Sequence, residues 1–286
     1  PPPPPPPPIF FFKQMTEYAI LSGLVGSEMC IRDSLNSLLT SKTKIVSIVG
    51  ESNMSGMLPN IKEIVSNVKS KSDAIFILDG AQLVPHRFVD VQDLGIDFLC
   101  VSGHKMLGPT GIGVVWGRKE LWDSMDPVYG GGDMIEEVYY DKATWAPVPH
   151  KFEAGTPPFV EAIGLGVAAE YLMNITMSEV QQHSDSLREY AKSKLENIDG
   201  LNVIHSISKN AGCTFAMSVE GAHAADISLM LDTYGVAVRA GHHCVQPFHR
   251  KLKLDATFRA TGYIYNNEED FDTLAYAIEN SIKMLK

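Results

Sequence analysis

The chain has 286 residues, 45% of them hydrophobic, which is enough apolar material to fill a core and excludes a disordered chain. Its 24 lysines and arginines against 34 aspartates and glutamates give a net charge of −10, and the absence of any basic block of five or more residues argues against nucleic acid as the main partner. The longest strongly apolar stretches are shorter than the roughly 18–20 residues that a membrane span needs, so we expect no membrane partner.

The first 34 residues do not have the pattern of a folded segment. Residues 1–8 are all proline, three phenylalanines stand at 10–12, and no helical or strand period is visible up to Ser34. A disordered tail and a targeting peptide are the alternatives, but a targeting peptide would need a basic start, an uninterrupted apolar stretch and a cleavage site. The run GSEMCIRDS at 26–34 resembles translated assembly artefacts. We therefore expect residues 1–34 to be non-native or disordered.

From Leu35 to about residue 160, short strands alternate with helices. Four β-branched or apolar runs predict strands, and apolar positions at helical spacing predict a helix between the first two. The strands are expected at Lys44–Val49, Ala74–Leu78, Phe98–Ser102 and Gly113–Trp116, and the helix at Asn60–Val68. This order indicates an α/β fold with a mostly parallel sheet covered by helices.

The pattern changes near Glu161, where two helices follow one another. The expected elements are helices at Glu161–Met173, Ser178–Asn197, Ala224–Tyr234 and Glu268–Leu285, and strands at Leu201–His205, Thr214–Val219 and Val236–Arg239. This second half is expected to form an α+β domain packed on the first.

Two neighbouring strands are followed by residues that carry chemistry. Asp79 ends one strand, and Ser102, His104 and Lys105 follow the next. Alone, Asp79 would more often be a helix cap or a turn residue, and Lys105 a solvated surface lysine. Ligands of open α/β sheets lie at such strand ends, and a lysine with a carboxylate suits pyridoxal phosphate (PLP): the amine forms a Schiff base and the acid keeps the ring nitrogen protonated. Ser102 and His104 are candidate donors to its phosphate.

A second cluster surrounds Cys244, in the run VRAGHHCVQP. Zinc is one alternative, but a further ligand at a recognisable spacing is missing, and the other three cysteines form no CxxC pair. A reactive cysteine is favoured, since the charges of nearby arginine and histidine side chains would favour its thiolate. Downstream, Arg259 is placed where it could clamp a carboxylate, although a lone arginine is more often a salt-bridge partner. The cysteine usage suits a reducing compartment.

Five motifs occur in the order LDGAQLVPHRFVDVQDLGIDF, SGHKMLGPTGIGVVW, YGGGDMI, KFEAGTPP and VRAGHHCVQP. From about residue 38 to 286, the chain resembles the class V aminotransferase family of PLP enzymes, specifically its group II, SUF-type cysteine desulfurases related to selenocysteine lyase. The resemblance implies the PLP-dependent transferase fold type I (aspartate aminotransferase-like). Residues 35–160 would be part of the large PLP-binding domain, and residues 161–286 the C-terminal small domain with the cysteine loop.

The resemblance also implies roles for individual residues. Lys105 would form the Schiff base with PLP, and Asp79 would pair with the ring nitrogen. The other cofactor contacts would be Gln82 to the phenolic oxygen, Ser102 and His104 to the phosphate, Asn53 near the ring and substrate, and Thr156 to the phosphate of the other subunit's cofactor. The last contact makes a homodimer the expected form.

In the same family pattern, Arg259 binds the substrate carboxylate and Cys244 takes the sulfur, which converts L-cysteine to L-alanine and leaves a persulfide. His243 and Arg239 are the residues expected to favour the Cys244 thiolate, and Arg239 is also expected to help bind the substrate. The persulfide would pass to a SUF-type acceptor protein for iron–sulfur cluster assembly, in the cytoplasm or, if the source is eukaryotic, in a plastid.

Complete members of this family are longer, so an N-terminal part that carries the phosphate-binding loop and a ring-stacking histidine is expected to be missing. The fragment itself is then expected to be weakly active or inactive. Two alternatives stay open beside the desulfurase: a selenocysteine lyase or other class V lyase, and a non-catalytic remnant.

Overall fold

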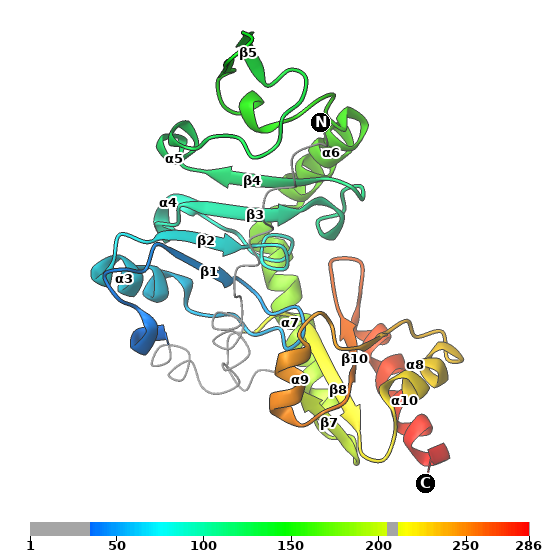
Figure 1. Cartoon of the computed structure of the whole chain (residues 1–286). Helices are drawn as coiled ribbons and strands as arrows, with labels where there is room; N and C mark the ends of the chain where they lie inside the picture. Colours follow the sequence, from blue (N-terminus) through cyan, green and yellow to red (C-terminus); the bar gives the residue numbers. More distant parts are fainter. Residues whose placement is uncertain (1–34, 205–210, 286) are drawn as a thin grey trace, which may run out of the picture.

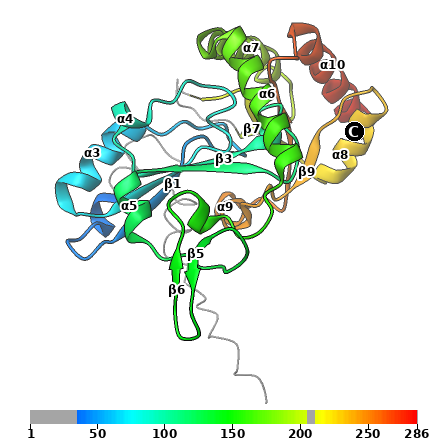
Figure 2. The same ribbon diagram turned by 90° about the horizontal axis from the view of Figure 1, so that it is seen from above.

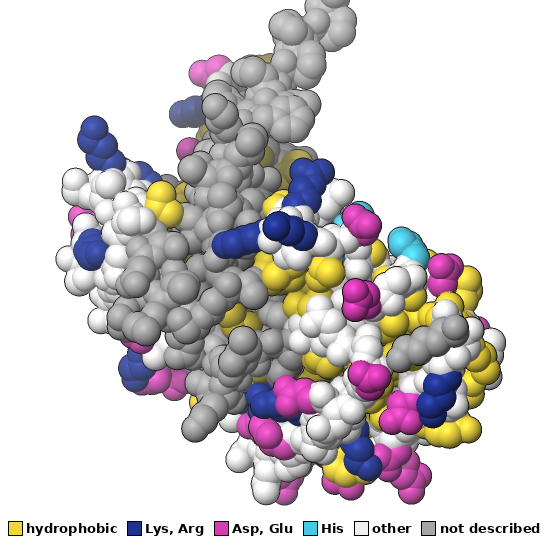
Figure 3. Space-filling model, turned by 90° about the horizontal axis from the view of Figure 1, so that it is seen from below, with side chains coloured by type: hydrophobic (Ala, Val, Ile, Leu, Met, Phe, Trp, Pro, Cys, Tyr) yellow, Lys and Arg dark blue, Asp and Glu magenta, His cyan; other side chains and the backbone are white. Residues whose placement is uncertain are grey.

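The computed structural model describes residues 35–204 and 211–285, which form two β-sheets connected by long helices (Figure 1). The prediction for residues 1–34 lies outside this part of the chain, as does His205 at the end of one expected strand. Hydrophobic, acidic and basic side chains are interspersed over the described part of the face in Figure 3, with no single sign of charge dominating it.

The first sheet has four strands, in the order β1 (Ile45–Val49), β2 (Ile75–Asp79), β3 (Phe98–Ser102) and β4 (Gly113–Gly117). The first three strands are parallel, and β4 pairs with β3 in the antiparallel sense. The predicted mostly parallel sheet is therefore confirmed, with each strand within one residue of its expected bounds. In Figure 1 the strands lie one above the other, and α3 (Ile61–Lys71) and α4 (Val91–Leu94) flank them.

Helix α3 covers the sheet because its apolar residues share one face. Ile61, Ile64, Val65 and Val68 are buried in the same core as Phe76 and Leu78 of β2. The side chain of Asn60 accepts a hydrogen bond from the Glu63 amide and caps the helix, which continues three residues beyond its predicted end at Val68.

Asp97 fixes the start of β3 to its neighbours. The side chain is 4% exposed, and its Oδ2 accepts hydrogen bonds from the Phe76 amide at 2.7 Å and from Lys69. Its Oδ1 lies 3.2 Å from Nε of Arg118. A buried carboxylate with these three donors holds the helix, the second strand and the end of β4 in register.

We expect Asp97→Ala to lower the free energy of unfolding by about 3 kcal/mol, because the buried Phe76 amide then loses its acceptor and two cations lose their counter-ion. Urea unfolding followed by circular dichroism measures the change. The matched control is Asp93→Ala, which removes an exposed ion pair with Lys62 and is expected to change stability by less than about 1 kcal/mol. Equal losses in the two variants would contradict the role given to Asp97.

The second sheet is antiparallel, in the order β7 (Leu201–Ile204), β8 (Thr214–Val219), β10 (Thr257–Thr261) and β9 (Arg239–Gly241). Three helices, α7 (Met177–Leu195), α8 (Ala224–Asp232) and α10 (Glu268–Leu285), share its core (Figure 1). The predicted bounds of β8 and α10 match those of the structure at both ends.

The expected strand at Val236–Arg239 was wrong in position. The strand begins at Arg239, which pairs with Arg259 of β10, while Val236 and Val238 pack against the core without pairing. Strand β10 and the short helix α4 were not predicted. Also missed were α5 (Lys119–Ser124), α9 (Gln246–Leu252) and a hairpin of β5 (Ile135–Val138) and β6 (Ala143–Trp145), which stands away from both sheets in Figure 2.

Helix α6 (Phe159–Ile175) connects the two sheets and meets α7 at a bend of 76°. Within residues 35–204 and 211–285, no single helix is both long and apolar enough to cross a membrane; the bent pair α6–α7 meets that test by length and composition only.

Candidate active site

The carboxyl ends of β2 and β3 lie side by side and present Asp79 and Lys105 at the same edge. Asp79 is in register with Cys100, and the Gly80 amide donates to the Cys100 carbonyl at 2.9 Å. After Ser102, β3 continues into a 3-10 turn at 103–105 that carries His104 and Lys105. A Cβ on Gly103 would lie 2.9 Å from the Ile112 carbonyl oxygen, so glycine is required where this turn folds back on β4.

Lys105 lies in a cluster of charged and nucleophilic groups. Burial lowers the pKa of Lys105, the charges of Arg259 and Arg239 add to this effect, and Asp79 and Cys244 act against it. Since such effects need proximity, the structure brings together all five residues, which come from both sheets. A half-buried lysine with a lowered pKa is more often an uncharged, nucleophilic amine than a surface lysine is.

Cys244 is exposed on a tight turn between β9 and α9. Both His243 (φ 50°) and Cys244 (φ 62°) have left-handed backbone conformations, which side-chain-bearing residues seldom adopt. Two hydrogen bonds hold the turn: His243 Nε2 lies 3.1 Å from the Thr257 carbonyl, and Asn53 Nδ2 donates to the His243 carbonyl at 2.7 Å. The thiol is thus presented by a backbone that the second sheet and Asn53 constrain together.

His243 does not supply the positive charge that the sequence suggested for Cys244. Burial, with Arg259 as a further cause, lowers the pKa of His243 to about 4, so the ring is neutral at pH 7. Because Nε2 donates to the Thr257 carbonyl, Nδ1 is the unprotonated nitrogen. The expectation of a charged histidine was therefore wrong, and the cations near the thiol are Arg259 and, opposite it on β9, Arg239.

Only part of the hydrogen-bonding capacity of the Arg259 guanidinium is used within the described residues. Its Nη1 donates to the Asn53 carbonyl at 2.7 Å, while its buried Nε has no hydrogen-bond partner among the described residues. Arg239 lies opposite on β9. A second arginine beside a half-buried one is unfavourable without an anion, so the pair is suited to a carboxylate.

The other predicted site residues are less closely connected. Ser102 and Gln82 are half-buried near the two strand ends, and His104 is exposed. Thr156 is exposed in the segment before α6, and within residues 35–204 and 211–285 no hydrogen bond or ion pair connects Thr156 or Gln82 to Lys105. Asn53 does join the site, through its contacts with His243 and Arg259.

These residues fit PLP. Lys105 offers an amine with a lowered pKa, and Asp79 an exposed carboxylate of which Oδ1 accepts from the Ala81 amide. Ser102 and His104 offer donors for a phosphate. Among residues 35–204 and 211–285, no group of three or more histidine, cysteine, aspartate or glutamate side chains is placed to hold a metal ion.

Sequence reasoning missed Glu51. This residue lies between β1 and Asn53 in the chain, and its side chain is only 1% exposed. The only signal was its position after a predicted strand, and a glutamate there is ordinarily a solvated turn residue.

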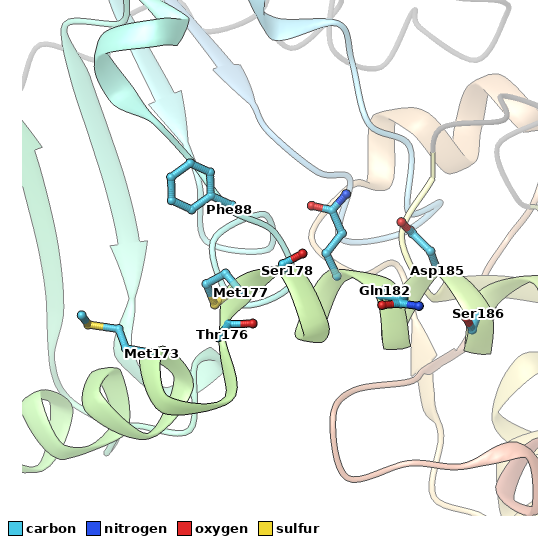
Figure 4. Close-up of a pocket in the computed structure, with 9 residues that line it drawn as sticks. Phe88, Met173, Thr176, Met177, Ser178, Gln182, Asp185 and Ser186 are labelled. Atoms are coloured by element: carbon cyan, nitrogen blue, oxygen red, sulfur yellow. The ribbon is translucent and has the colours of Figure 1, made fainter.

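A cavity of about 820 Å³ lies elsewhere, at the bend between α6 and α7 (Figure 4). Phe88 faces the two helices there, and none of the predicted site residues lines it. The predicted site residues therefore lie apart from this cavity.

The chain matches the family model described as aminotransferase class-V over residues 25–274. It is 43% identical over 249 residues to a probable cysteine desulfurase of Halalkalibacterium halodurans, a match that covers 87% of this chain and 61% of that protein. It is also 43% identical over 242 residues to a cysteine desulfurase of Haloferax volcanii, covering 85% and 57%. The chain thus spans about three-fifths of the length of these relatives.

Solved structures agree with this similarity. The cysteine desulfurase CsdA of Escherichia coli superposes with a TM-score of 0.84 at 35% identity, covering 89% of this chain and 63% of that one. The apo cysteine desulfurase of Thermococcus onnurineus NA1 gives 0.85 at 30% identity, covering 92% and 64%. The predicted type I fold is confirmed.

Proposed function

The chain belongs to the aminotransferase class-V family, and on this premise we propose that the whole protein is a PLP-dependent cysteine desulfurase, which converts L-cysteine to L-alanine. The observation that carries the proposal is the cluster around Lys105, where Asp79, Cys244, Arg239 and Arg259 all act on the lysine. An amine, an acid, a thiol and two carboxylate-binding cations are the groups that this reaction needs. Named cysteine desulfurases at 43% identity support it further.

When bound, PLP supplies an aldehyde that captures an amine and a ring that withdraws electrons from the substrate carbon. Lys105 would hold the cofactor through its aldehyde, and its amine would move a proton at the substrate Cα. Asp79 would hold the proton on the ring nitrogen. Arg259 and Arg239 bind the substrate carboxylate and so orient the side chain of the substrate toward Cys244.

Cys244 carries out the sulfur transfer. Its thiolate attacks the substrate Sγ, the Sγ–Cβ bond breaks with its electron pair left on the carbon, and a proton joins that carbon to give alanine. The sulfur atom stays on Cys244 as a persulfide.

We further propose a homodimer in which Thr156 reaches the partner's cofactor, a SUF-type acceptor protein for the persulfide in iron–sulfur cluster assembly, and a cytoplasmic location. Persulfide chemistry needs a reduced thiol, and Cys100, Cys213 and Cys244 are free. The division into a partial large domain at 35–160 and a small domain at 161–286 belongs to the same proposal.

The test measures alanine and protein-bound persulfide after the chain is mixed with PLP and L-cysteine, beside the same assay with L-selenocysteine. Equal molar yields of alanine and persulfide in a single turnover support the desulfurase. Turnover of selenocysteine alone would make the protein a selenocysteine lyase. Binding of PLP without either product would leave a cofactor-binding chain that lacks the activity.

Arg259→Ala is expected to lower kcat/KM for cysteine by roughly 10- to 100-fold, the loss that one charge-assisted pair of hydrogen bonds corresponds to. The loss should appear mainly in KM, because the carboxylate is bound equally before and during the reaction. Steady-state alanine formation measures it, with the exposed Arg250→Ala on α9 as the control. A fall confined to kcat would argue against a carboxylate at Arg259.

A further inference from the structure

Glu51 is a buried acid at the joint between the two sheets. It follows β1 and Gly50, and its side chain is 1% exposed. The carboxyl lies against the backbone of Gly212, just before β8: a Cβ added to Gly212 would be 1.9 Å from Glu51 Oε1. Only a glycine leaves room for the carboxyl at this point of the joint.

The backbone beside Glu51 connects directly to the second sheet. The Gly212 amide donates to the Gly56 carbonyl at 2.7 Å, and Met57 forms an antiparallel bridge with Ala211. Gly56 has φ 66°, and a Cβ there would lie 2.9 Å from the Gly212 carbonyl oxygen. The segment from Glu51 to Met57 and the start of β8 therefore form one tightly packed seam.

Four ionisable groups face Glu51 or the seam: Arg87 from the loop after β2, Asp185 and Arg188 from α7, and Cys213 at the start of β8. Arg87 already pairs with Asp185 at 2.5 Å and donates to the Ala211 carbonyl at 3.4 Å. Within the described residues, Glu51 Oε2 and Arg87 Nε have no hydrogen-bond partner.

The acid is therefore uncharged at neutral pH. Burial raises the pKa of Glu51 to about 8, with Asp185 adding to the increase and Arg87 opposing it. An ionised carboxylate at this place would lack both water and a dedicated cation, and such a group is strongly destabilising.

Asn53, two residues after Glu51, contacts both Arg259 and the loop that carries Cys244. Its carbonyl accepts from Arg259 and its side chain donates to the carbonyl of His243, next to Cys244. The position of the turn at 51–53 therefore sets the position of the arginine and of the thiol.

We propose that Glu51 is a positioning residue of the active site, which seats the turn at 51–53 against Gly212 as a neutral acid and so keeps Asn53 in reach of Arg259 and the Cys244 loop. The assignment rests on the proposed function, in which Arg259 and Cys244 act on the substrate. When Glu51 ionises, the seam loosens and the Cys244 loop opens more often.

Hydrogen exchange measured by mass spectrometry tests this proposal on the whole chain. Wild type is compared with Glu51→Gln, which has the size and the neutral charge of the protonated acid, at several pH values on both sides of 8. For the peptide 239–252, the ratio of exchange rates, wild type over variant, is expected to be close to one below neutral pH and to rise severalfold above about pH 8. Comparing both proteins at each pH cancels the intrinsic pH dependence of exchange.

Two controls separate positioning from general destabilisation. The peptide covering α3 is expected to keep a ratio of one at every pH, and the exposed Glu170→Gln on α6 to follow wild type throughout.

A constant ratio across the pH range would overturn the proposal, as would equal acceleration in α3. So would a Glu51→Gln variant that opens at neutral pH, because that result would show that the charge is needed. If the ratio rises as expected while wild type forms no alanine from cysteine, the positioning of the loop stands and the proposed reaction fails.

Discussion

Lys105→Ala is expected to remove the visible absorption band that appears when the wild-type chain is incubated with PLP. The band requires a covalent bond between an amine and the cofactor aldehyde, and Lys105 is the lysine that the structure places beside Asp79, Cys244 and the two arginines. Loss of this amine is also expected to lower any alanine formation by roughly 10³-fold or more. Absorption spectra of both proteins after gel filtration measure the first effect.

The matched control is Lys119→Ala. Lys119 is an exposed lysine on α5, paired with Asp123, and its removal should leave the band intact. A band that persists in Lys105→Ala would place the cofactor on another lysine and contradict the site. A band absent from both wild type and variant would show that this chain does not hold the cofactor.

The elements that were predicted closely are those whose signal is local. Strand β8 is a short, almost fully buried run that contains four apolar residues, and α10 has apolar residues on one helical face, so the residues of each element define its bounds. Strand β9 depends on where Arg239 meets Arg259 of β10, a pairing between segments distant in the chain. Its start could not be predicted from the β-branched residues that precede it.

The same distinction applies to the site. Asp79 and Lys105 follow strands, and their neighbourhood could be predicted because parallel strands end at a common edge. The neutral state of His243 results from its burial and from the charge of Arg259, and the contact of its carbonyl with Asn53 joins residues 190 positions apart. The burial of Glu51 runs against the ordinary behaviour of glutamate, so no pattern in the sequence could indicate it.

Cys244→Ala is expected to abolish alanine formation from L-cysteine while the absorption band of the bound cofactor persists. Lys105 and Asp79 lie on the first sheet and do not need the thiol to hold the cofactor, whereas no other free cysteine among the described residues has an exposed side chain. The step that breaks the Sγ–Cβ bond thus loses its acceptor. Alanine assays and spectra on the same sample separate the two effects.

Two further variants show whether the thiol itself is required. Cys244→Ser keeps a side chain of similar size on the strained turn but cannot form a persulfide, so it is expected to be as inactive as Cys244→Ala. Cys30→Ala, outside the predicted site, is expected to retain the wild-type rate. If Cys244→Ala instead loses the absorption band, Cys244 helps to hold the cofactor and the nucleophile lies elsewhere. Retained alanine formation would contradict the assignment outright, because it would mean that sulfur leaves the substrate without passing through this thiol.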